Sequence, residues 1–182
     1  MSSPLATTAY RFTESHDYVP VSASSQNLKQ EWESKSDVLQ GTARNWLPDA
    51  RAALFTIGRE CNHEGWDGEG SHAVRPETID IAAKVAQAMF VSLPLGTLAP
   101  DVMPDADGEV ILEWIVDQQR VFSLSVGSNG RASYAGRFGQ RGSTHGWLEL
   151  KLTNLMELEQ SLDVVVTSVR RLLREDAAGH TT

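Results

Sequence analysis

Apolar and polar residues alternate with a period of two in the middle of the chain, which is typical of half-buried β-strands. Three such runs follow one another between residues 110 and 138. Their apolar positions are Val110, Leu112, Trp114 and Val116, then Phe122, Leu124 and Val126, then Ala132, Tyr134 and Phe138. Short polar links separate the runs, so the pattern predicts an antiparallel β-meander of three strands, with four strands as the alternative.

Residues that face each other on paired strands must lie on the same side of a sheet, and this rule predicts the register. The expected facing pairs are Trp114 with Phe122, Leu112 with Leu124, and Leu124 with Tyr134. This register leaves three-residue loops at residues 117–119 and 128–130. Gly130 then occupies the position in a three-residue hairpin loop that requires a left-handed residue.

Apolar residues three and four positions apart predict two helices before the meander. The first begins near Pro48 and ends before Gly65, and the second begins at Pro76 and ends before Pro94. Proline suits a first helical turn because its missing N–H would have no helical partner there. The prediction is therefore a pair of helices that precede the sheet.

The C-terminal part of the chain has the strongest helical pattern. Its apolar positions are Leu155, Leu158, Leu162, Val165, Val166, Val169, Leu172 and Leu173. Asn154 and Glu157 precede them with the spacing of a capping box. We expect one long amphipathic helix that packs on the sheet, giving an α+β fold of a meander covered by helices.

Composition and size indicate one domain. The chain has 182 residues, of which 41% are hydrophobic, enough for a single sizeable core. Residues 1–25 lack a sustained period, so we expect a flexible N-terminal arm there. A thin apolar stripe predicts a helix over residues 28–40. The α+β domain is expected to extend over residues 26–176, with a flexible tail at 177–182.

Cysteine usage and hydropathy bear on location. No stretch of about 18 consecutive apolar residues occurs, which argues against a membrane span. The single cysteine, Cys61, cannot form an internal disulfide, so a reducing compartment, the bacterial cytoplasm, is expected.

Charge bears on partners. The formal net charge of −8 argues against nucleic acid, because that affinity depends on Lys and Arg that neutralise phosphates. Residues 101–117 contain six carboxylates and no Lys or Arg, whereas residues 118–148 contain four arginines and no carboxylate. This segregation favours a protein partner.

The outward side of the expected meander carries both basic and apolar residues. Arg131 and Arg137 point away from the core, and Arg141 follows in a glycine-rich loop. Ile111 and Ile115 also point outward, and a partly apolar face is normally covered. These five are the candidate binding residues, but the favoured interpretation of the charges is that Glu109 and Glu113 neutralise the arginines. The sheet face and the C-terminal helix are also candidate surfaces for a homo-oligomer.

The densest cluster of polar functional groups is the segment 61–72. Imidazole and carboxylate groups are common ligands of zinc and iron. The possible metal ligands are His63, Asp67, Glu69 and His72. However, no recognised ligand spacing is present. The favoured interpretation is structural: Trp66 anchors the loop in the core, and Asp67 hydrogen-bonds the backbone of a glycine-rich turn.

Three short motifs resemble a widespread group of small, uncharacterised bacterial proteins. They are W-D-G-E-G at 66–70, D-G-E at 107–109 and L-E-W at 112–114. The likeness covers roughly residues 60 to 138. The resemblance implies no activity, so no catalytic residues follow from it, but it suggests an accessory gene of a mobile element.

Two classes of function remain. Neither a Walker loop, a nucleophile elbow nor a kinase signature is present, so no catalytic residues and no cofactor are expected. The favoured class is a non-catalytic protein-interaction module, such as an antitoxin, immunity or anti-defence protein. The alternative is a small metal-assisted hydrolase or ligand-binding enzyme centred on residues 61–72. Convergence of the four possible ligands in one pocket would support the enzyme.

Overall fold

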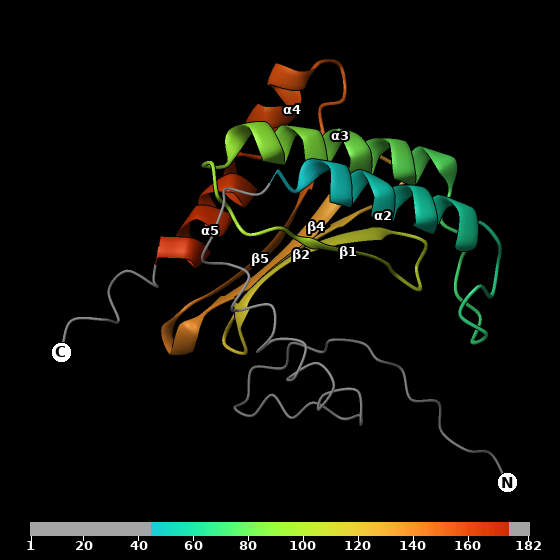
Figure 1. Ribbon diagram of the computed structural model, residues 1–182, viewed down its shortest axis with the longest axis horizontal. Coiled ribbons are helices and arrows are strands. Elements are labelled where there is room, and N and C mark those ends of the chain that lie inside the picture. Colours follow the sequence, from blue (N-terminus) through green and yellow to red (C-terminus); the bar gives the residue numbers. More distant parts are fainter. Residues whose placement is uncertain (1–44, 175–182) are drawn as a thin grey trace, which may run out of the picture. The chain divides into compact units, whose positions relative to one another are not determined.

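The computed structural model describes residues 45–174, which form an α+β structure (Figure 1). In chain order the elements are α2 (Leu47–Glu60), α3 (Pro76–Ser92), β1 (Asp101–Pro104), β2 (Val110–Asp117), β3 (Arg120–Val126), β4 (Arg131–Phe138), the short 3₁₀ turn η1 (Gly139–Arg141), β5 (Ser143–Glu149), α4 (Leu155–Ser161) and α5 (Asp163–Arg174). The expected arm at 1–25, the helix at 28–40 and the tail at 177–182 lie outside the described residues. No helix between residues 45 and 174 has both the length and the apolar character needed to cross a membrane.

The sheet is an antiparallel meander of five strands in the order β1-β2-β3-β4-β5. The α+β class is confirmed, but the expectation of three or four strands is wrong. β1 has only four residues and ends on a proline, so it is too short to show an alternating pattern. In β5 the three residues that point toward the core include Gly146, which removes one apolar position from the alternation.

The predicted register of the central strands is confirmed. The pairs Trp114 with Phe122, Leu112 with Leu124, and Leu124 with Tyr134 are all present. Gly130 has a φ of 73°, the left-handed conformation expected in its loop. The predicted three-residue loop at 117–119 is wrong, because Asp117 pairs with Arg120 after a register shift. Only Gln118 and Gln119 remain between the strands, and Val116 is the extra residue of the bulge.

The core lies between one face of the sheet and the helices. α2 packs on α3 and β1, α3 packs on β2 and β3, and α5 packs on β2, β3 and β4, so that the helices lie on one side of the strands (Figure 1). Trp114 and Phe122 are fully buried at the centre of this face. The helices contribute fully or almost fully buried apolar residues, among them Val85, Met89, Val165, Val169 and Leu172. Each such side chain contributes about 1.5–3 kcal/mol relative to an exposed position.

The expected long C-terminal helix is two helices, and this is a second correction. Leu162, with φ of −92° and ψ of 3°, ends α4, and α5 begins at Asp163. The hydroxyl of Ser161 donates to the carbonyl of Leu158 at 2.7 Å, a back-bond that bends helices. The bend serves packing, because α4 contacts α3 whereas α5 contacts the sheet. The predicted cap is confirmed, since the Asn154 side chain accepts from the Glu157 N–H at 2.9 Å.

Candidate functional site

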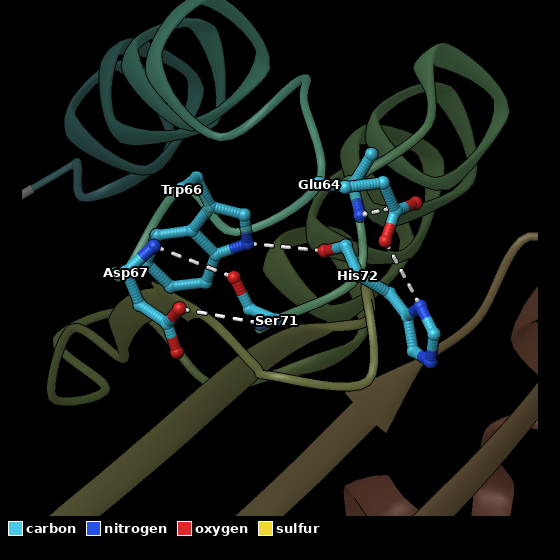
Figure 2. Close-up of polar contacts among 6 residues, drawn as sticks. Glu64, Trp66, Asp67, Ser71 and His72 are labelled. Carbon is cyan, nitrogen blue, oxygen red and sulfur yellow. Dashed lines mark hydrogen bonds and ion pairs between the residues drawn. The ribbon is translucent and has the colours of Figure 1, made fainter. Parts of the chain in front are cut away.

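The loop that follows α2 is organised by Trp66 and Asp67 (Figure 2). The indole Nε1 of Trp66 donates to the carbonyl of His72 at 3.0 Å, and its ring packs against the core. Oδ1 of Asp67 accepts from the N–H groups of Glu69 at 2.8 Å and Ser71 at 3.2 Å. These contacts confirm the structural interpretation of the segment, in which Trp66 anchors the loop and Asp67 hydrogen-bonds the backbone of the turn.

Both ends of this loop are also fixed. The Val74 N–H donates to the carbonyl of Cys61 at 2.8 Å. Oε1 of Glu64 accepts from the Ala73 N–H at 3.3 Å, and Oε2 lies 3.1 Å from Nδ1 of His72. The loop is therefore closed on itself by backbone and carboxylate contacts, as Figure 2 shows for Glu64 and His72.

The electrostatics of the loop follow from these hydrogen bonds. The backbone N–H of Glu69, and then the Ser71 hydroxyl and N–H, hold the pKa of Asp67 below its usual value. The backbone N–H of Ala73, and then the His72 ring, lower the pKa of Glu64 in the same way. Both carboxylates stay ionised because they accept hydrogen bonds from their own loop.

The thiol of Cys61 is held in the neutral form. Its side chain is buried beneath the start of the loop. Burial, and then the neighbouring Glu60 carboxylate, raise the pKa of Cys61 above its usual value. A buried thiol of raised pKa is a poor nucleophile and a poor metal ligand.

The four possible metal ligands do not converge. His63 and Glu69 are exposed, and Asp67 and His72 are engaged in separate contacts within the loop. Between residues 45 and 174 no group of three or more His, Cys, Asp or Glu side chains could hold a metal ion. This arrangement opposes the metal-site interpretation of the segment.

The D-G-E turn docks on the same loop. The His72 N–H donates to the carbonyl of Ala106 at 2.7 Å. Gly108 has a φ of 76°, and a Cβ at this position would lie 2.8 Å from the backbone oxygen of Ala73. Only glycine combines this backbone conformation with so close an approach. The D-G-E turn therefore docks on residues 72–73, at the end of the loop that Trp66 and Asp67 organise.

The side of the sheet opposite the helices forms a second candidate site, which we call the outer face. In the observed register its residues are Ile111, Glu113 and Ile115 on β2, Val121, Ser123 and Ser125 on β3, Arg131, Ser133, Ala135 and Arg137 on β4, and Ser143, His145, Trp147 and Glu149 on β5. The apolar branched side chains lie on β2 and β3, short side chains lie in the middle, and the basic and aromatic side chains lie on β4 and β5. The outer face thus has two chemically distinct halves.

The structure places four of the five candidate binding residues on the outer face. Ile111 and Ile115 are half-buried on β2. Arg137 is half-buried on β4, and the exposed Arg131 lies over the Trp147 ring, with Cζ 4.8 Å from the ring centroid. Arg141 belongs to η1, and its side chain is outside the described set. The two isoleucines are separated from the two arginines by β3.

The glutamates of β2 and of the turn before it do not act as simple counter-charges for the arginines. Glu113 is only 6% exposed, and its Oε1 accepts a hydrogen bond of 2.5 Å from the Ser123 hydroxyl. Glu109 likewise accepts from the Ser125 hydroxyl. Burial raises the pKa of Glu113 above its usual value, the Ser123 hydrogen bond opposes this shift, and the Asp101 carboxylate adds to it. A buried carboxylate of this kind costs stability when ionised.

Replacing Glu113 by glutamine is expected to raise the free energy of unfolding at neutral pH, because it removes a buried charge. The folded-state pKa of Glu113 is raised, so its ionisation lowers stability as pH rises from the unfolded-state pKa through the folded-state pKa. The gain in Glu113→Gln should therefore vanish below the unfolded-state pKa. Urea unfolding across pH tests this, with the exposed Glu69→Gln as control. A gain that persists in acid would contradict the assignment.

Sequence reasoning missed Trp147 as a surface residue. It is 63% exposed on β5 and forms the aromatic end of the outer face. Thr144, Gly146 and Leu148 alternate with residues that point outward, and this alternation could have predicted strand β5. Gly146 interrupts the pattern because it has no apolar side chain. A prediction of β5 would have placed His145 and Trp147 on the outer face.

Comparison with known proteins gives no relative. No protein-family model, no curated protein and no solved structure matches this chain.

Proposed function

We propose that the protein is a non-catalytic protein-interaction module that binds a partner through its outer face. The kind of protein that fits is an antitoxin, immunity or anti-defence accessory protein of bacteria or their mobile elements. The observation that carries the proposal is the placement of Ile111, Ile115 and Val121 on the sheet side opposite the helices α2, α3 and α5. Apolar side chains in such a position normally serve as a contact surface.

The charges of the outer face define the chemistry of the partner. Arg131 and Arg137 lie on the β4 side of the apolar residues, where they face Glu149 and Ser143 of β5. The nearby carboxylates of Glu109 and Glu113 are already hydrogen-bonded to serine hydroxyls. The complementary surface is an apolar stripe flanked on one side by Asp or Glu.

The loop at 61–72 supplies no support for an enzyme. The carboxylates of Glu64 and Asp67 accept hydrogen bonds from their own loop, and two of the possible ligands, Asp67 and His72, are engaged in separate contacts. Of the motifs that carry the resemblance, W-D-G-E-G forms part of this loop and D-G-E docks on its end, which is consistent with a structural role. The face of the sheet is therefore the better candidate for function.

Paired variants test the proposal. The full-length chain carrying Ile115→Thr and Arg131→Glu should lose capture of the partner that wild type retains from a lysate of its native host. Threonine preserves the β-branched shape, and Arg131 is exposed, so folding should be kept. The matched control is Phe55→Thr with Arg59→Glu on α2, where Phe55 is 72% exposed. Equal capture by both variants, or loss by both, would contradict a role of the outer face.

A further inference from the structure

β5 presents a row of backbone groups at the edge of the sheet. The Phe138 N–H donates to the Gly142 carbonyl at 2.7 Å, and the Leu150 N–H donates to the Gly130 carbonyl at 2.7 Å. Antiparallel pairing alternates, so these bonds and the β4–β5 register assign the even-numbered residues of β5 to the ladder with β4. The odd-numbered residues, Ser143, His145, Trp147 and Glu149, direct their N–H and C=O groups away from β4. β5 is the last strand of the sheet formed by residues 45–174.

The two edges of the sheet differ in how they are protected. β1 at the opposite edge has four residues, begins with an aspartate, ends on Pro104 and packs beside α2. Short length, proline, charge and a covering helix are the means by which proteins prevent pairing at an edge. β5 has seven residues and one carboxylate, Glu149 at its end, contains no proline, lysine or arginine, and shows no register shift against β4. The sequence thus protects one edge and leaves the other suited to pairing.

The side chains that accompany this free edge are open to a partner. All four odd-numbered residues of β5 are exposed, and Trp147 is 63% exposed. Gly146 in the middle of the strand has no side chain. A Cβ there would lie 2.7 Å from the Tyr134 hydroxyl, so the packing of Tyr134 requires the glycine.

We propose that β5 pairs antiparallel with β5 of a second copy of this chain, with the two-fold axis at Gly146, to form a continuous ten-stranded sheet. In this register His145 faces Trp147 of the second copy, and Ser143 faces Glu149 of the second copy. All four outward N–H and C=O pairs of each strand then find partners. The inference goes beyond the proposed function and does not depend on it.

This register is the one that the strand supports best. Moving the axis by one residue, to His145 or Trp147, leaves an outward residue of β5 without a partner inside the strand. With the axis at Gly146, two glycines meet where antiparallel strands approach most closely, at about 4.5 Å between Cα atoms. On the outer face an exposed imidazole lies against an exposed indole, an aromatic cross-strand pair.

Charge complementarity also favours this register. Arg137 is the neighbour of Ser143 on β4. Glu149 of the second copy lies on the other side of the same serine. The short Ser143 side chain allows the guanidinium and the carboxylate to meet across it, and the two-fold axis repeats the contact. A net charge of −8 on each copy opposes association, and these local contacts offset it where the strands meet.

A proline at position 145 tests the backbone pairing. In the full chain, His145→Pro removes an N–H that does not serve the β4 ladder, so the fold is retained, as circular dichroism and thermal unfolding should confirm. His145→Ala keeps that N–H and is the matched control. Sedimentation equilibrium over a dilution series should show dimers for wild type and His145→Ala, with dimerisation weakened about tenfold or more in His145→Pro. A monomeric wild type, or equal dimerisation of the two variants, would overturn the proposal.

Disulfide trapping tests the register independently of folding. In a Cys61→Ser background, Ser143→Cys combined with Glu149→Cys should cross-link two copies under mild oxidation, because facing Cα atoms about 5.5 Å apart allow a disulfide. Ser143→Cys alone should not cross-link, because the two copies of residue 143 lie about 20 Å apart along the strands. Cross-linking by the single variant, or a dimer that the double variant does not cross-link, would contradict the pairing of β5 in this register. Capture of a different protein through the outer face is a separate result and leaves this outcome unchanged.

Discussion

Gly108→Ala is expected to lower the free energy of unfolding by about 2–4 kcal/mol. The left-handed backbone at Gly108, with a φ of 76°, costs a non-glycine residue about 1–2 kcal/mol. The new methyl group would also lie 2.8 Å from the backbone oxygen of Ala73, and a backbone atom cannot move as a flexible side chain can. Relieving this contact adds about 1–2 kcal/mol more. Urea unfolding of the full chain measures the loss.

Gly68→Ala separates the two contributions to this loss. Gly68 has a φ of 80°, close to that of Gly108, but no atom lies within 4 Å of its expected Cβ. Its replacement should therefore cost only the backbone term, about 1–2 kcal/mol. The difference between the variants measures how firmly the D-G-E turn is docked on the loop at 61–72. Equal losses would mean that the two segments separate at little cost.

Phe122→Ala is expected to cost about 3–5 kcal/mol, the range for a large aromatic residue removed from a core. Phe122 is fully buried between two aromatic neighbours on the adjacent strands. Its ring centroid lies 6.3 Å from that of Trp114 and 6.2 Å from that of Tyr134. Val121→Ala, next along the chain but on the half-buried outer face, is the control and should cost much less. Comparable losses would place the core on the wrong side of the sheet.

A double-mutant cycle identifies what the Phe122 ring fills. A Cβ on Gly136 would lie 2.6 Å from Cδ2 of Phe122, so Gly136→Ala should be destabilising in the wild-type chain. In the Phe122→Ala background the ring is absent, and the same change should cost less, with the contacts to Phe138 Cζ at 3.1 Å and Thr144 Cγ2 at 3.3 Å remaining. The expected coupling is about 1–3 kcal/mol. Strict additivity of the two losses would show that the ring is not held against Gly136.

The hydrophobic pattern predicted those parts of the fold that depend on local order. The period of two over β2, β3 and β4 predicted their register, because each apolar residue of a meander must share a face with its neighbour on the next strand. The starts of α3 and α4 were predicted by Pro76 and Asn154, because capping chemistry acts within one turn.

The candidate sites were predicted in part for the same reason. The period-two alternation of β2 and β4 predicts that Ile111 and Arg131 point away from the core and lie on the same face of the sheet. The structural interpretation of Asp67 follows from the glycines around it, which permit the turn. Sequence periodicity could not place Trp147, because Gly146 interrupts the alternation of β5.

The sequence by itself thus determined the α+β class, the central meander and the face of each central strand. Only the tertiary structure decided the edge strands, the bend at Leu162, the burial of Glu113 and the docking of Gly108 on the loop after α2. Contacts between different elements decide these features: Gly146 of β5 is required by Tyr134, Glu113 is held by Ser123, and Gly108 lies against Ala73. The bend at Leu162 lets α4 contact α3 while α5 contacts the sheet. Such contacts leave no periodic trace along the chain, because they are made by surfaces that meet only after the chain has folded.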